Sequence, residues 1–149
     1  MSRGTLWQED SRRDLHARFH RLAPDRRPRW GRLDANQMLC HLCDQLRVAL
    51  GEQPAEAVAG PLRRAPLKQL VMYWLPWPKG AISFKECFTT TSTDWDTNLG
   101  RLEQLMEKFA TQDPERPWPP HPLFGDMSGR AWGYLSYRHF RHHLRQFGV

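Results

Sequence analysis

The stretch RAWGYLSYRHFRHHLRQFGV, residues 130–149, has the pattern of one amphipathic helix. At about 100° per residue, its apolar side chains fall on one face and three arginines fall on the opposite face. The first face consists of Trp132, Leu135, Ser136, His139, Phe140, His143, Gln146 and Phe147, and the second of Arg138, Arg141 and Arg145. Because the large apolar side chains favour burial and arginine does not, we expect the first face to point inward. His139 and His143 then lie at the centre of the buried face, one helical turn apart.

Four further segments have helical periodicity or signals of helix ends. They span residues 8–22, 34–50, 67–75 and 94–110, and the last helix begins near residue 128. Asp34 and Ser128 are of the types that cap a helix N-terminus, and Gly51 is of the type that ends one.

Two segments have no helical pattern. Residues 113–125 hold four prolines between positions 117 and 122, so they cannot be helical. They are expected to cross one end of the fold, with Trp118 and Phe124 as anchors. β-Branched residues gather only in residues 82–93, which we expect to be extended or loop. The whole pattern predicts an all-α protein with one domain over residues 1–149, and a four-helix bundle with one additional short helix is the simplest arrangement.

Composition narrows the classes of protein. A chain of 149 residues with 40% hydrophobic positions is long enough for one packed core. The longest apolar run, residues 70–77, is far shorter than the roughly 18 to 20 residues of a membrane span. The opening MSRGTLWQEDSRRD has no apolar core of a signal peptide, and three cysteines do not form a disulfide framework. We therefore expect no membrane association and a cytoplasmic location.

The two histidines of the last helix suggest a metal site, because imidazoles at positions i and i+4 can bind one ion. The third ligand must come from a facing helix, and His41, on the flank of its helix's apolar stripe, is the candidate. Three neutral histidines leave a position open for water or substrate, as in catalytic sites. The alternative is that these are buried, hydrogen-bonded core histidines. The remaining histidines are assigned to the surface or to the rim of the site; they are His16, His20, His121 and His142.

Two stretches resemble one known family. PDRRPRWGRLDANQMLCHLCDQLRVALG, residues 24–51, and HPLFGDMSGRAWGYLSYRHFRHHLRQFGV, residues 121–149, are similar to the DinB/YfiT-like superfamily, and closest to a bacterial branch of unknown function. Members carry one histidine on an early helix and an H-x-x-x-H pair on a late helix, followed by a glutamine. The resemblance places His41 on the early ligand, His139 and His143 on the pair, and Gln146 on the trailing glutamine.

The resemblance implies a four-helix bundle with a divalent metal ion, zinc or nickel, bound by three histidines. Many relatives are dimers, so it also implies a homodimer. Characterised relatives include thiol S-transferases that use small cytosolic thiols, and others were proposed to be hydrolases. The expected substrate is a small molecule, either a thiol, as for these relatives, or an anionic compound, which fits the net charge of +6. Such an ion lowers the pKa of bound water or holds a thiolate.

Three features near this candidate site allow two interpretations each. Asp44, one turn from His41, is a candidate base or partner of the site, but we favour an ordinary solvated carboxylate. Cys40 and Cys43 form a C-x-x-C motif, typical of a redox dithiol or of half a zinc knuckle. Because they lie inside a helix and no second C-x-x-C exists, packing or surface thiols are the favoured interpretation. The arginine-rich loop, residues 25–32, surrounds Trp30 and could bind an anionic partner, or it is a solvated loop with Trp30 packed as an anchor.

The sequence thus leaves two hypotheses for function. The first is a divalent-metal-dependent enzyme, a transferase or hydrolase, with the three histidines as ligands. The alternative is a non-catalytic binding module in which the arginine-rich loop contacts an anionic partner. Basic residues are otherwise scattered over every helix without forming a stripe, so nucleic acid is not the expected partner.

Overall fold

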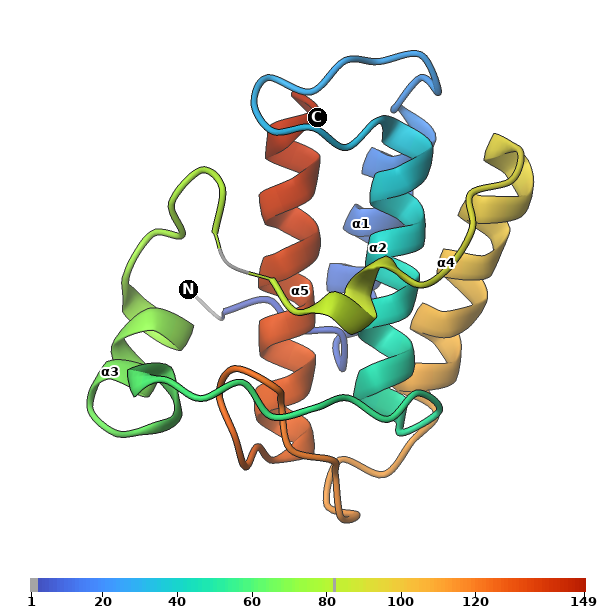
Figure 1. The fold of residues 1–149 in the computed structure, drawn as a ribbon. Coiled ribbons are helices and arrows are strands. Elements are labelled where there is room, and N and C mark those ends of the chain that lie inside the picture. Colours follow the sequence, from blue (N-terminus) through green and yellow to red (C-terminus); the bar gives the residue numbers. More distant parts are fainter. Residues whose placement is uncertain (1–2, 82) are drawn as a thin grey trace.

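Four long helices form the frame of the computed structural model, which describes residues 3–81 and 83–149 (Figure 1). They are α1 (Glu9–His20), α2 (Ala35–Leu50), α4 (Trp95–Ala110) and α5 (Gly129–Gln146). A shorter segment holds the turn η1 (Pro61–Arg63) and α3 (Leu67–Gln69), which continues into the π-helical η2 (Leu70–Trp74). The described residues contain no strand, so the predicted all-α class is confirmed.

The helix ends lie within about two residues of the predicted ones because the expected capping residues form the expected bonds. The Asp34 carboxylate accepts from the Gln37 N–H at 2.7 Å, and the Gln37 side chain accepts from the Asp34 N–H at 3.0 Å. Gly51 ends α2 with a φ of +78°, a left-handed conformation that favours glycine. The Ser128 hydroxyl accepts from the Ala131 N–H at 3.2 Å at the start of α5.

Residues 82–93 were expected to be extended or loop, but part of this segment is helical. It contains the 3₁₀ turn η3 (Lys85–Phe88), in which the Cys87 N–H donates to the Phe84 carbonyl at 3.1 Å. Phe84 and Cys87 are buried by this turn, so tertiary burial outweighs the β-branched composition. Ile82 lies outside the described residues.

α2 lies at the centre of the fold and is buried along most of its length. It packs against α4 on one side and antiparallel to α5 on the other, and α1 contacts both α4 and α5 (Figure 1). As expected, residues 113–125 pass one end of the helices (Figure 1), with Phe124 buried and the Trp118 ring 5.1 Å from that of Phe109 between ring centres. α5 therefore faces α2 across a short distance, which brings their histidines together.

The outer face of α5 is not wholly open to solvent, contrary to the helical projection. The segment with α3 and η2 lies beside α5 (Figure 1). The Arg138 guanidinium reaches across to it. It donates to the carbonyl of Val71 at 2.8 Å and to those of Met72 and Leu75, and lies 4.9 Å from the Trp77 ring centre. The projection placed Arg138 on the outward face but could not show that a distant segment covers this face, because it considers one helix alone. Among the described residues, no helix has both the length and the apolar character of a membrane span.

Candidate metal centre

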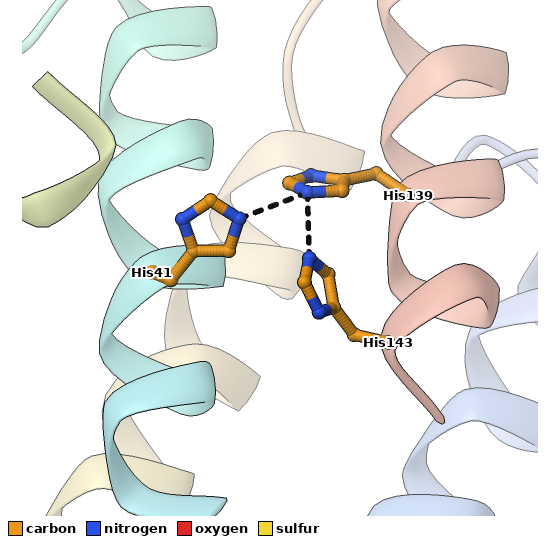
Figure 2. Close-up of side chains that lie close together, drawn as sticks. All are labelled: His41, His139 and His143. Carbon is orange, nitrogen blue, oxygen red and sulfur yellow. Dashed lines mark hydrogen bonds between the residues drawn. The ribbon is translucent and has the colours of Figure 1, made fainter. Parts of the chain in front are cut away.

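Three histidines from two helices converge at one point (Figure 2). The Nε2 atom of His139 lies 3.0 Å from Nε2 of His41, on α2, and 3.0 Å from Nε2 of His143, one turn further along α5. His41 and His143 are buried and His139 is partly buried. The structure thus brings together the three residues that the sequence selected as candidate ligands.

Hydrogen bonds on the far side of two rings fix which nitrogen carries the proton. His41 Nδ1 lies 3.1 Å from the Cys87 carbonyl, and His143 Nδ1 lies 2.7 Å from Oε1 of Gln146. The Gln146 amide nitrogen donates to the Trp30 carbonyl at 2.7 Å, so Oε1 is the atom turned to His143. Because a carbonyl oxygen only accepts, both Nδ1 atoms carry the proton and both Nε2 atoms present a lone pair.

The three Nε2 atoms are better suited to binding a cation than to hydrogen-bonding with one another. Burial lowers the pKa of His41 to about 4 and that of His143 to about 3, and it holds the pKa of His139 well below its usual value, so the rings are neutral near pH 7. Only His139 can then place a proton among the three Nε2 atoms, and one proton cannot satisfy both 3.0 Å contacts. Nitrogen ligands at the usual ~2.1 Å from one zinc ion are about 3.0–3.4 Å apart, which matches these distances.

The centre opens into a cavity of about 430 Å³. Its wall includes six aromatic or aliphatic side chains that come from four separate parts of the chain: Trp30, Leu62, Trp77, Phe84, Phe88 and Leu123. Phe88 stacks on the His41 ring with 4.8 Å between the centres. A cavity of this size and lining accommodates a small, mostly apolar molecule next to the three histidines.

Asp44 is not a solvated carboxylate, so the favoured interpretation of this residue is wrong. It is fully buried, and it accepts from the backbone N–H groups of Thr89 and Thr90, each at 2.9 Å. Arg47 donates to its other oxygen at 3.1 Å. The carboxylate therefore holds the loop after η3 against α2, a contact between distant segments that helical periodicity cannot predict.

The four remaining histidines divide into three environments. His16 and His20 both contact the Glu103 carboxylate, at 3.0 and 2.6 Å, on the outside of α1 as expected. His142 is partly buried and lines the edge of the cavity, 5.9 Å from Trp30 between ring centres. His121 was expected at the surface or the rim, but it is buried in the wall of the cavity.

The cysteines and the arginine-rich loop both make contacts within the fold. Cys40 and Cys43 are buried free thiols, as the interpretation of packing thiols expects, and burial raises the pKa of both, that of Cys43 to about 12. In the loop, Trp30 forms part of the cavity wall, as an anchor should. The backbone N–H of Arg29 donates to the Gln146 carbonyl at 2.6 Å, and the Arg26 guanidinium donates to the Phe147 carbonyl at 3.2 Å.

Comparison with known protein families gives a match over part of the chain. A family described as "Protein of unknown function (DUF1569)" matches residues 80–148. The matched residues contain α4, α5 and two of the three converging histidines, His139 and His143, whereas His41 lies before them. No curated protein and no solved structure matches the chain.

Proposed function

We propose that His41, His139 and His143 bind a divalent metal ion, zinc or nickel, and that the chain is a metal-dependent enzyme acting on a small molecule. The observation that carries the proposal is the convergence of the three Nε2 atoms, with that of His139 3.0 Å from each of the other two and with the protons of His41 and His143 held on their Nδ1 atoms. Hydrogen bonds of this kind to the outer nitrogen orient the histidine ligands of metal sites.

We further propose that the fold is a four-helix bundle of the DinB/YfiT-like superfamily. The mutual contacts of α1, α2, α4 and α5 support it, as does the position of the ligands on one early and one late helix. Within that superfamily, a thiol-dependent S-transferase or a hydrolase is the activity that an open three-histidine site supports.

The chemistry follows from the open position. When bound, the ion supplies a nucleophile at neutral pH, by acidifying a water molecule or by holding a thiol as thiolate. The protein's own side chains fix the geometry: Gln146 and the Cys87 carbonyl orient two imidazoles, and Trp30, Trp77 and Phe88 enclose the space beside them. An apolar enclosure excludes water and strengthens electrostatic interactions within it.

Metal titration of the purified, untagged protein tests the binding step. We expect one zinc or nickel ion per chain in the wild-type protein, measured by elemental analysis after dialysis, and none in H139A. The matched control is H16A, because His16 and His20 share the i, i+4 spacing but bind Glu103 outside the site. Circular dichroism checks that each variant keeps its helices. Equal metal content in H139A and in wild type, or no uptake by either, would refute the site.

Turnover is tested separately with general probes. Hydrolysis of p-nitrophenyl acetate tests the hydrolase activity, and conjugation of cysteine to 1-chloro-2,4-dinitrobenzene tests S-transfer. Activity that follows the metal content, present in wild type and H16A and lost in H139A, supports the enzyme. Activity equal in all three proteins would show that the histidines do not carry the reaction.

A further inference from the structure

Hydrogen bonds within its own turn determine which ring nitrogen of His121 carries the proton. Its Nδ1 atom accepts from the backbone N–H groups of Leu123 at 3.0 Å and Phe124 at 3.3 Å. A nitrogen that accepts two N–H groups presents its lone pair, so the proton of the neutral ring is on Nε2. Burial, reinforced by the charges of Lys68 and Arg63, lowers the pKa of His121 to about 3. The side chain is therefore a neutral N–H donor over the whole physiological pH range.

The backbone around His121 is held at several points. His121 and Gly125 exchange two backbone hydrogen bonds of 2.8 Å, and Gly125 has a φ of +71°, which favours glycine. The Trp132 indole donates to the Pro119 carbonyl at 2.9 Å, and Arg63 donates to the Pro122 carbonyl at 2.8 Å. A donor fixed in this way needs no reorganisation when it meets an acceptor.

Because Nδ1 is occupied by the backbone, Nε2 is the ring nitrogen that is left to contact a molecule in the cavity. The imidazole lies in the cavity wall with Phe84 and Phe124, at ring-centre distances of 5.4 and 5.0 Å. Among the described residues, Nε2 has no hydrogen-bond partner. In the described residues, the side-chain polar atoms that have no partner and are fully enclosed are Gln45 Oε1, Arg116 Nε and Arg141 Nε. His121 Nε2 is not one of them. Nε2 therefore keeps surface that a molecule in the cavity can contact.

We propose that the His121 Nε2–H group donates a hydrogen bond to the substrate, and that the substrate is a neutral, mostly apolar molecule with a carbonyl oxygen. A fixed N–H donor selects an acceptor, and the carbonyl is the strong neutral acceptor. The described lining residues contain only one permanently charged side chain, Arg32, and are otherwise rich in aromatic rings. The inference rests on the proposed function because it takes the cavity beside the three histidines as the substrate site.

Two probes that differ only in the acceptor test this inference. Acetophenone carries the carbonyl oxygen, and α-methylstyrene has the same shape with a CH₂ group in its place. Their dissociation constants are measured by NMR titration of the ¹⁵N-labelled protein, with and without zinc, and the Nε2–H signal of His121 is followed in the same spectra. We expect acetophenone, but not α-methylstyrene, to shift that signal.

Two substitutions separate binding from the structural role of the ring. H121N places an oxygen near the position of Nδ1, so it can keep the bonds to Leu123 and Phe124, but it lacks the cavity donor. H121Q places an amide N–H near the position of Nε2, but it lacks the acceptor for the turn. We expect H121N to weaken acetophenone binding about three- to tenfold, the range for one hydrogen bond, and to leave α-methylstyrene unchanged. H121Q should be less stable to urea but should keep more of the preference for acetophenone than H121N does.

Each outcome decides one question. Equal binding of both probes to wild type, no binding of either, or a preference that H121N keeps would overturn the inference. The hydrogen bond does not involve the metal, so the preference is expected in zinc-free protein as well. A protein that takes up no zinc but shows the preference would refute the proposed metal site and leave the role of His121 standing; zinc uptake without the preference would do the reverse.

Discussion

Replacement of Gln146 by methionine should loosen both the fold and the proposed metal site. The side chain is almost fully buried and makes two hydrogen bonds of 2.7 Å, one from His143 Nδ1 and one to the Trp30 carbonyl. Methionine has a similar length and removes both. Each hydrogen bond contributes about 1 kcal/mol net, and a buried partner left unpaired adds to the loss, so we expect Q146M to unfold with about 2–3 kcal/mol less free energy than wild type.

The effect on metal binding has a different cause. Without Oε1 nothing holds the proton of His143 on Nδ1, so its Nε2 lone pair is no longer fixed towards His41 and His139. Loss of such an outer hydrogen bond weakens metal binding by roughly 10- to 100-fold. Q146E serves as the matched variant: its carboxylate still accepts from His143 but cannot donate to the Trp30 carbonyl. Q146E should therefore lose stability and keep its zinc affinity.

Urea unfolding followed by circular dichroism gives the free energies, and competition with a chromophoric chelator gives the zinc affinities. We expect the two variants to differ in zinc affinity and to resemble each other in stability. Zinc affinity of Q146M within about twofold of wild type, well below the expected loss, would refute the role assigned to Gln146. It would mean that the helix alone orients His143.

Three further predictions concern other parts of the fold. In R138M, amide hydrogen exchange across residues 67–77 should accelerate, because the guanidinium that bonds the carbonyls of this segment is gone; unchanged exchange would contradict the contact. D44N should lose about 2–3 kcal/mol in urea unfolding, because an amide cannot accept from both backbone N–H groups and the arginine as the buried carboxylate does; a loss below about 0.5 kcal/mol would be inconsistent with that burial. Below about pH 6.5 His121 is protonated in the unfolded chain but not in the folded chain, where its pKa is about 3. Acidification from pH 7.5 to 5.5 should therefore lower the free energy of unfolding by about 1.4 kcal/mol through this residue. The stability of metal-free H121N should therefore fall less with acidification than that of metal-free wild type, and parallel curves would argue against the low pKa.

The helices and the three converging histidines were predictable because both depend on local patterns. A capping residue acts within its own turn, so Asp34 and Ser128 mark helix starts in the sequence alone. The spacing of His139 and His143 places them on one face of one helix, and the apolar residues around them show that this face is buried. His41 could be selected from its place on the flank of the apolar stripe of α2.

The roles of Asp44, Arg138 and His121 were not predictable because each depends on a segment that is distant in sequence. Helical periodicity compares a residue only with its own helix, so it cannot show the loop that buries Asp44 or the segment that covers Arg138. His121 lies among prolines, where there is no periodicity to read. The one local signal was its place two residues before Leu123, within reach of the following backbone N–H groups.

The position of Asp44 has a consequence for the charge balance of the candidate centre. This carboxylate lies on the same helix as His41, yet its oxygens are occupied by Thr89, Thr90 and Arg47. The three histidines that converge are neutral, and the described residues that line the cavity beside them include no carboxylate. A divalent cation held there would keep its full charge in an apolar enclosure, which is unfavourable unless an anion accompanies it. A hydroxide or thiolate from solution would then have to neutralise part of the charge of the ion. The neutral surroundings of the centre would in this way favour binding of the nucleophile.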